Sequence, residues 1–434
     1  MRNVLYAMVG VFVIMTTGTS AVCEDYGWYV SGNIKPDMRV KVELMNPTDT
    51  ARDHSPITIR RCDMPFGDCY SDWLTVVDPD LSVPEGAENG GYIPSQADDI
   101  DKDGIWDELF FFTDFEAHES KTLYVYIGRN TQGEFNHKTH AEVGSYGKHV
   151  VPWWESEYMG WKLWFPNACD LYGRREVKLV SFNNITNSYG HNAPYDAGID
   201  IMLVGNTFGA GGICLFEEPA HPDSVSRPRF SPSMDKGPFT NTRYAYDIVA
   251  NGPLRSIVRS RTMNWSTGKG SYELDQLFTA YASKYYYTCK VTFSQFLPVN
   301  AETDFGCGIR KLPNESTQFQ QDGIVISATD NLKHIITPIE GDPGLKRGVE
   351  EFLGLALVVK DNYNPSYRAI EGFSGNHTFR IPSTGNPGYE YLVASAWSEG
   401  VSITDYESFK EYVFDTAFEY NNPVRIQSLT PEKK

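Results

Sequence analysis

The sequence predicts an all-β protein: an N-terminal immunoglobulin-like β-sandwich, then a large, supersandwich-like two-sheet antiparallel β-sandwich with a C-terminal helix. Most apolar segments are short, β-branched or aromatic, and bounded by Gly, Pro, Asn and Asp, which is typical of strands. The 26 Tyr, 24 Phe and 9 Trp residues can fill sandwich interiors. Because no fixed repeat period is present, a sandwich is favoured over a propeller.

The first residues have the pattern of a secretory signal peptide. Arg2 precedes the apolar run 4–15, and small residues follow it. We therefore expect residues 1–21 to be removed and the mature protein to be secreted or periplasmic. A lipoprotein tether at Cys23 is less favoured, because Val22 rather than a small residue precedes it. No other segment reaches the roughly 20 apolar residues of a membrane helix, so no membrane span is expected.

Charge and cysteine content limit the partners and the cross-links. With 38 basic and 56 acidic residues the formal charge is -18, which argues against nucleic acid as a partner. Cys62 and Cys69 are close enough in sequence to close a small disulfide loop, but their spacing leaves the pairing open. The oligomeric state is also left open.

Strand patterns occur on both sides of a polar stretch at 128–150. The clearest are 40–44, 109–112, 123–127, 286–293, 324–326 and 391–394. We expect an immunoglobulin-like domain at 22–130, because on the order of 100 residues suits that sandwich. The larger sandwich is expected at 150–425 and is the predicted catalytic domain.

One segment near the C-terminus has helical spacing. Thr404 to Glu407 forms a capping-box pattern, and Phe409 and Val413 follow at helical intervals. Pro423 would end the helix.

An acidic segment at 98–108 has the pattern of the first half of a calcium-binding loop. Alternate carboxylates before a turn-forming glycine converge on a hard cation. The predicted ligands are Asp99, Asp101, Asp103 and Asp107. Phe110 replaces the usual acid at position twelve, so a solvated acidic turn is the alternative. Any calcium would be structural, and no cofactor is expected for catalysis.

The stretch 170–212 concentrates the residues of a candidate active site. His191 lies between Tyr189 and Tyr195 in a Gly-, Asn- and Pro-rich segment, which favours a loop. A histidine titrates near neutral pH and can act as a general base, although a plain surface histidine is the alternative. Arg174 or Lys162 would neutralise a substrate carboxylate. Four other histidines, at 118, 137, 140 and 149, lie in polar linker or turn sequence without the spacing of metal ligands.

Three further residues are candidates for substrate binding: Glu157, Arg175 and Asp200. The glycine run 209–212 is expected to permit tight backbone turns. It does not form a phosphate loop, because a strand pattern rather than a helix follows it.

An ordered series of motifs resembles a family of secreted bacterial proteins long defined only as a domain of unknown function. The motifs are at 92–109, 154–157, 170–175, 198–201, 204–206, 208–212, 251–255, 393–397 and 422–423. Members of that family occur in polysaccharide-degradation systems, and the resemblance implies a link to an ulvan-oligosaccharide dehydratase. Tyr158, Ala197 and the placement of His191 depart from the family pattern, which leaves open a different substrate or a lost activity.

These observations lead to β-elimination on uronic-acid-containing oligosaccharides, by dehydration or lyase-type cleavage, as the first hypothesis. His191 would remove the proton beside the carboxylate, and Tyr189 or Tyr195 would protonate the leaving oxygen. The alternatives are a glycoside hydrolase that uses Glu157 and Asp200, and a non-catalytic sugar-binding protein. In the latter, Trp153, Trp154, Trp161 and Trp164 would form a platform, although the same residues could be core.

Overall fold

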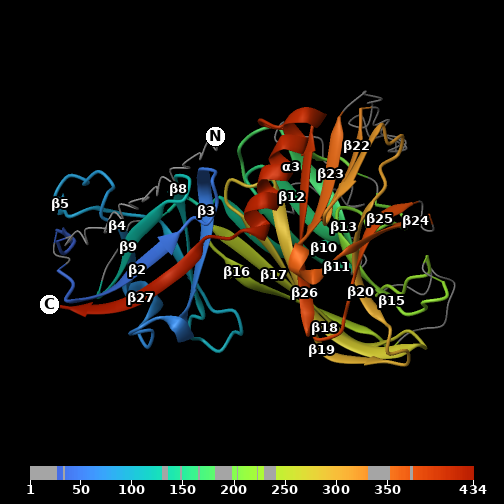
Figure 1. Ribbon diagram of the computed structural model, residues 1–434, viewed down its shortest axis with the longest axis horizontal. Coiled ribbons are helices and arrows are strands. Elements are labelled where there is room, and N and C mark those ends of the chain that lie inside the picture. Colours follow the sequence, from blue (N-terminus) through green and yellow to red (C-terminus); the bar gives the residue numbers. More distant parts are fainter. Residues whose placement is uncertain are drawn as a thin grey trace, which may run out of the picture.

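The computed structural model describes residues 27–32, 35–129, 135–146, 149–164, 167–180, 198–202, 204–221, 223–228, 241–330, 352–371 and 375–434. Within these ranges the chain is built mostly from antiparallel strands, and α3 (Tyr406–Asn421) is its one α-helix. The predicted all-β class and the C-terminal helix are therefore confirmed. A smaller and a larger sandwich lie next to each other, and α3 packs on the larger one (Figure 1).

The smaller sandwich has two facing sheets. One has the order β27-β2-β9-β4-β6 and the other β3-β8-β7. Their strands are β2 (Met38–Met45), β3 (Arg52–Arg60), β4 (Leu74–Asp78), β6 (Gly91–Tyr92), β7 (Ser95–Asp98), β8 (Glu108–Phe115), β9 (Ser120–Ile127) and β27 (Arg425–Lys433). A short ribbon joins β1 (Val30–Ser31) to β5 (Ala87–Glu88), and 3-10 turns occur at Arg61–Asp63 and Ser71–Trp73. Side chains alternate between the two faces of a strand, so Val40, Val42 and Leu44 of β2 all point into the core of the smaller sandwich.

Strand β27 comes from the opposite end of the chain. It crosses from α3 to the smaller sandwich and pairs along β2, from Met38 opposite Lys433 to Met45 opposite Arg425 (Figure 1). The sequence predicts an N-terminal domain of residues 22–130 alone. In the structure, residues 425–433 add an edge strand to its first sheet, because β27 completes a row of backbone hydrogen bonds that β2 would otherwise leave open.

The larger sandwich has one long sheet covered by two shorter sheets. The long sheet has the order β16-β17-β18-β19-β26-β23-β22-β21, and the shorter ones are β10-β11-β12-β13-β14 and β15-β20-β25-β24. The strands of the shorter sheets are β10 (Thr139–Tyr146), β11 (His149–Ser156), β12 (Met159–Trp164), β13 (Ala168–Arg174), β14 (Gly198–Asp200), β15 (Gly212–Phe216), β20 (Asp304–Arg310), β24 (Ser366–Ile370) and β25 (Asn376–Ile381). Those of the long sheet are β16 (Arg243–Asn251), β17 (Arg255–Ser266), β18 (Gly270–Tyr281), β19 (Tyr286–Pro298), β21 (Thr317–Gln321), β22 (Ile324–Thr329), β23 (Leu353–Val359) and β26 (Gly388–Trp397), and a 3-10 turn at Asp361–Tyr363 follows β23.

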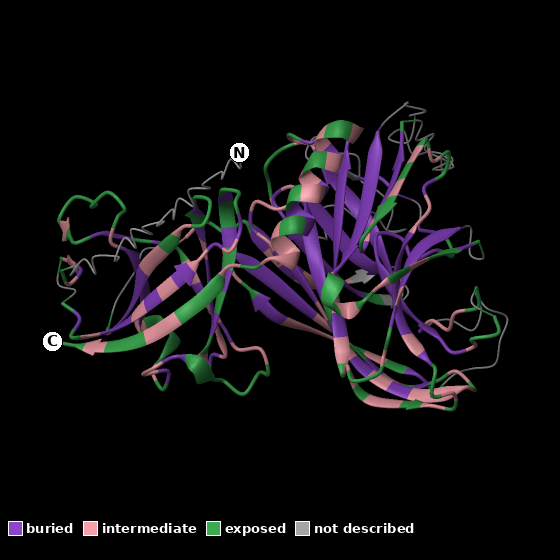
Figure 2. Cartoon of the chain, viewed as in Figure 1, coloured by how far each residue is buried: buried purple, intermediate pink, exposed green. Residues whose placement is uncertain are grey.

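Aromatic side chains join the layers of the larger sandwich. Trp154 of β11 stacks on Phe278 of β18 with ring centroids 4.5 Å apart, and Trp161 of β12 meets Tyr287 of β19 edge-on at 5.3 Å. Strand β23 is buried along its whole length, and α3 covers it. Figure 2 shows this contrast, with the strands of the larger sandwich mostly buried and the outer side of α3 exposed.

Helix α3 starts one residue later than its capping box predicts. Asp405, not Thr404, is the N-cap, and its carboxylate accepts a hydrogen bond from the Ser408 backbone N–H at 2.9 Å. Phe409 and Val413 face the core as predicted. A Cβ at Gly354 of β23 would lie 2.5 Å from Phe409, so the glycine allows the helix to approach the sheet closely.

A buried ion-pair network links the two sandwiches. Arg255 of β17 donates from Nε to Asp98 at 2.6 Å and from Nη2 to Glu108 at 2.8 Å, and both acids belong to the smaller sandwich. The Gln96 side chain accepts from the backbone N–H groups of Leu254 and Arg255. Because these groups are held on one side by β7 and β8 and on the other by the start of β17, they fix how the sandwiches meet.

The described cysteines are free thiols. Cys62 and Cys69 do not form the loop disulfide that their spacing had left open. Cys169, Cys214 and Cys307 are buried in the larger sandwich together with Cys289. The predicted signal peptide and Cys23 lie outside the described residues. Among those that are described, no helix is long and apolar enough to cross a membrane.

Replacing Arg255 by Met should destabilise the protein strongly. The substitution leaves Asp98 and Glu108 without their cation, and breaking a buried pair costs about 3–5 kcal/mol. Arg261→Met, on the same strand, removes an exposed pair with Asp275 and should cost less than about 1 kcal/mol. Urea unfolding of both variants measures the difference. Equal losses would contradict the assigned role of Arg255.

Candidate functional site

The five-stranded sheet β10–β14 has two chemically different faces. Met159, Trp161 and Leu163 of β12 point into the core, while Gly160 and Lys162 point the other way. Cross-strand register brings two rows together on this second side. One row runs His140, Glu155, Gly160, Tyr172, Asp200, and the next runs Glu142, Trp153, Lys162, Asp170. We call this side of the sheet, with Arg174, the charged face.

Lys162 is the centre of the second row. Its side chain is 1% exposed, and Nζ lies 2.9 Å from a carboxylate oxygen of Asp170. The same Nζ donates a hydrogen bond to the Tyr172 hydroxyl oxygen at 2.5 Å, and it lies 4.9 Å from the Tyr172 ring centroid. A buried ammonium thus has a carboxylate and a phenol as neighbours, which is an arrangement that can move a proton.

Asp200 lies opposite Tyr172 on the edge strand β14. Burial raises its pKa well above the ordinary value, and the nearby Asp170 charge raises it further. Lys162 and a hydrogen bond from the Met202 backbone N–H act in the opposite direction. Asp200 therefore holds a proton more readily than an ordinary solvent-exposed carboxyl group.

Arg174 and Glu155 form a fully buried ion pair beside this group. Arg174 Nη2 donates to Glu155, whose carboxylate also accepts from the Val180 backbone N–H at 3.1 Å. Among the described residues, Arg174 Nε and Nη1 have no hydrogen-bond partner although they are buried. Such donors are rare in native structures and mark a place where a ligand or water can bind.

His140 completes a chain of charged groups across three strands. Its Nδ1 lies 3.1 Å from Glu155 Oε1, and this hydrogen bond raises the pKa of His140, while partial burial lowers it. A charge change at His140 is thereby coupled to the Glu155–Arg174 pair. The sequence predicts polar linker or turn around His140, which is wrong, because His140 is part of β10.

Gly160 leaves the space in which the buried arginine lies. A Cβ at this position would fall 2.5 Å from the Trp153 ring and 2.7 Å from Arg174 Nη2. Trp153 meets the Tyr172 ring edge-on at 4.9 Å, and the Arg174 guanidinium carbon lies 5.5 Å from the Trp153 ring centroid. The glycine therefore allows the two halves of the charged face to pack together.

The structure assembles part of the predicted site. Lys162, Arg174 and Asp200 share the charged face. Arg175 points elsewhere, where it pairs with Glu399 and lies 5.2 Å from the Trp397 ring. The predicted catalytic residues His191, Tyr189 and Tyr195 lie outside the described residues.

Glu157 is also separate from the charged face. It accepts hydrogen bonds from the Ser283 backbone N–H and hydroxyl, at 3.0 and 3.1 Å, in the turn between β18 and β19. Of the predicted tryptophan platform, Trp154 and Trp161 belong to the core. These positions weaken the hydrolase and sugar-platform hypotheses in the form that the sequence favours.

The sequence prediction gives no site role to Asp170 or Tyr172. A usable signal was present, because Asp170, Tyr172 and Arg174 alternate along one strand and must share a face. The other neighbours in the site are set by the register between strands. That register depends on strand pairings that cannot be read from the sequence of a single strand.

The glycine run 209–212 is a packing element, as expected. Gly209 has a positive φ of 61°, and a Cβ there would lie 2.1 Å from the Cys169 carbonyl oxygen. A side chain at Gly211, whose φ is 124°, would meet the Tyr287 hydroxyl at 2.0 Å. Strand β15 follows the run.

In the acidic loop, ligand atoms of Asp99, Asp101 and Asp107 lie within 4.8 Å of one another. Asp103 is outside this group, and its carboxylate accepts from the Ile105 backbone N–H at 2.8 Å. Three carboxylates fit a hard cation, whereas the four-aspartate set predicted from the sequence is not assembled. Calcium binding at this loop stays a prediction.

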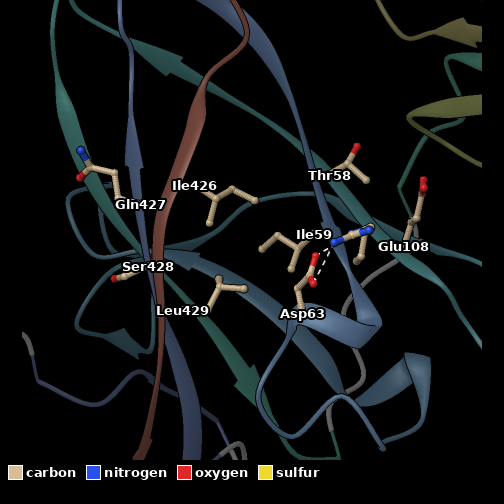
Figure 3. Close-up of a pocket in the computed structure, with 9 residues that line it drawn as sticks. Thr58, Ile59, Asp63, Glu108, Ile426, Gln427, Ser428 and Leu429 are labelled. Atoms are coloured by element: carbon tan, nitrogen blue, oxygen red, sulfur yellow. Dashed lines mark hydrogen bonds and ion pairs between the residues drawn. The ribbon is translucent and has the colours of Figure 1, made fainter. Parts of the chain in front are cut away.

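A separate open groove lies on the smaller sandwich. It runs between β3 and β27, with Ile59, Ile426 and Leu429 among its lining residues and an Arg60–Asp63 ion pair on its rim (Figure 3). None of the predicted site residues lines it, so it is not a candidate active site.

Comparison with known proteins gives a family and distant structural likenesses. The model of a family described as a domain of unknown function, DUF4861, matches residues 44–426. No curated protein matches the chain.

Two solved structures from Enterococcus faecalis are similar at low identity. One is a protein in glycosyl hydrolase family 38, at 9% identity and TM-score 0.48, and the other an alpha-mannosidase from strain V583, at 10% and 0.44. Each match covers 91% of this chain but only 48% and 46% of the two matched chains, respectively. This chain therefore spans about half the length of those proteins.

The stability of the protein should depend on the charge of His140. Because the folded-state pKa is raised, the stabilisation is fully present below the unfolded pKa of about 6.5 and is lost as pH rises through the folded pKa. We expect the free energy of unfolding to fall between pH 6 and pH 9 by more in the unmodified protein than in His140→Gln. Denaturant unfolding across this range tests it, and parallel pH profiles would refute the coupling.

Removing calcium should lower the melting temperature if the acidic loop holds the ion. We expect addition of EDTA to lower the midpoint and addition of calcium to restore it, because bound ligand stabilises the folded state. Asp99→Asn combined with Asp101→Asn should abolish the response. Identical melting curves with EDTA and with calcium would show that the loop is a solvated acidic turn.

Proposed function

The chain belongs to the DUF4861 family, and we propose that it is a carbon–oxygen lyase that acts by β-elimination on uronic-acid-containing oligosaccharides. The observation that carries the proposal is the charged face, where Lys162, Tyr172 and Asp200 meet in a buried setting. Of these three groups Asp200 has a raised pKa, and a perturbed carboxyl group in a buried cluster of ionisable side chains is typical of acid–base catalysis. The motif resemblance points to the same substrate class.

Two buried cations of the face are placed to meet an acidic ligand. Lys162 and Arg174 are paired with the carboxylates of Asp170 and Glu155. Among the described residues, Arg174 Nε and Nη1 have no hydrogen-bond partner. A uronate carboxylate would accept hydrogen bonds from such donors.

The groups also meet the chemical demands of elimination. A base removes the C5 proton beside the carboxylate, the C–H electron pair forms the C4–C5 double bond, and the C4–O bond breaks. Lys162 and Arg174 would stabilise the negative charge that develops on the carboxylate. A protonated Asp200 would donate its proton to the leaving oxygen, which departs as water or as a sugar hydroxyl.

Two groups are proposed for the proton removal. Tyr172 accepts a hydrogen bond from the Lys162 ammonium, which stabilises negative charge on its oxygen. His191, with Tyr189 and Tyr195, stays the base proposed from the sequence. Lys162 contacts both Asp170 and Tyr172, so its loss should remove the contact that polarises the Tyr172 hydroxyl.

Glycoside hydrolysis is the second candidate, because Asp170 and Asp200, two of the carboxyl groups of the face, lie on the paired strands β13 and β14. Asp200, with its raised pKa, would be the general acid, and Asp170, paired with Lys162, the ionised partner. The pair expected from the sequence, Glu157 with Asp200, is not used, since Glu157 is bound at Ser283. We further propose that the protein is exported, on the basis of its N-terminal sequence.

Turnover of 4-linked and of saturated uronic-acid oligosaccharides distinguishes the two reactions. Elimination produces a conjugated double bond that absorbs in the ultraviolet, whereas hydrolysis releases reducing ends without that absorbance. We expect ultraviolet absorbance with the unmodified protein. Lys162→Met, Tyr172→Phe and Asp200→Asn should each lower the rate by roughly 10²–10⁴-fold.

Arg175→Met is the matched control, because Arg175 pairs with Glu399 away from the charged face and its loss should leave the rate nearly unchanged. Release of reducing ends without ultraviolet absorbance would show that the reaction is hydrolysis and not elimination. A correctly folded protein without either signal on any acidic oligosaccharide would contradict both reactions.

A further inference from the structure

We propose that a cavity between the two sandwiches binds a small organic carboxylate, with Arg52 as its anchor. The cavity has a volume of about 180 Å³ and lies among β3, β8, β18, β19, β26 and the last turns of α3. This is below the roughly 300–1,000 Å³ of typical pockets for drug-sized ligands. The ligand is therefore small, and the site is separate from the charged face.

Arg52 is a buried cation without an ion pair in the described part of the chain. The residue is 3% exposed, and Nε and Nη2 both donate to the Thr48 hydroxyl, at 3.3 and 3.1 Å. Burial lowers the pKa of Arg52, while the charge of Glu419 acts in the opposite direction. A desolvated guanidinium without a carboxylate is costly, and a bound carboxylate would remove that cost.

The walls of the cavity suit a planar apolar body. Phe110 and Tyr281 have ring centroids 6.0 Å apart, and Tyr281 and Tyr286 lie at 5.6 Å. Small-molecule sites are commonly built in this way, with aromatic walls and a few polar groups that fix the orientation of the ligand. A flat carboxylate can meet the guanidinium with two oxygens and the rings with its body.

Of the charged groups that line the cavity, Arg52 is the one expected to attract a ligand carboxylate. Lys360 and Glu390 neutralise each other at 3.0 Å, and the Tyr420 hydroxyl donates to Glu390 at 2.8 Å. Glu419 has a raised pKa, mainly because it is buried, so it loses its charge more readily than an exposed carboxylate. A ligand carboxylate and the Glu419 carboxylate would both be attracted to the positive charge of Arg52.

Carbonyl groups at the end of α3 are weak alternative hydrogen-bond acceptors for Arg52, because they already accept other hydrogen bonds. Asn421 Nδ2 donates to the Ala417 carbonyl at 3.0 Å, and Asn422 Nδ2 to the Phe418 carbonyl at 2.9 Å. These bonds satisfy carbonyl groups that a helix C-terminus otherwise leaves exposed.

Calorimetric titration with benzoate and with benzamide tests the proposal on the full-length protein. The two probes have nearly the same shape and differ in charge. We expect saturable benzoate binding, at least about tenfold weaker binding of benzamide, and a higher melting temperature with benzoate. Equal affinity for the two probes, or no binding of benzoate at millimolar concentration, would overturn the assignment.

Three variants locate the site. Arg52→Gln should lower the affinity for benzoate about tenfold or more, whereas Arg61→Gln, which changes an arginine on the surface of the smaller sandwich, should not. Glu419→Gln should strengthen binding by about threefold or more, because it removes a like charge. If Arg52→Gln does not fold, as judged by circular dichroism, Glu419→Gln decides, and unchanged or weaker binding there would contradict the proposal. None of these readouts depends on lyase activity.

Discussion

The register of β11, β12 and β13 fixes the core and the charged face at the same time. Trp154, Trp161 and Leu171 point into the sandwich, and the residues between them carry the charges. Since side chains alternate, a slip of one residue would exchange the two sets. It would place Glu155, Lys162 and Arg174 against Phe278 and Tyr287. The apolar contacts between the sheets therefore also hold the polar groups in position.

Burial changes what these polar groups can do. Lys162 and Arg174 each have a carboxylate at bonding distance, as expected for cations removed from water. Asp200 is different, because the strongest influence on it is burial and not a counter-charge.

The fold was predictable where a local pattern determines it. Alternation along β2 and helical spacing in α3 depend on nearby residues, and both predictions were confirmed. The site was predictable only in part. Lys162, Arg174 and Asp200 were identified by residue type, but His140 and Glu155 become neighbours through strand pairing alone. Pairing across strands, like the joining of β27 to β2, is a long-range property that no local window contains.

The return of β27 to β2 also constrains how the protein folds. The first sheet of the smaller sandwich pairs residues 38–45 with residues 425–433, so its edge closes only after the larger sandwich has been synthesised. Contacts between such distant segments slow folding, because a long loop must be closed before they form. We infer that the larger sandwich folds first and that the smaller one is completed last. Until then β2 exposes an unpaired edge, which is a site for association with other chains.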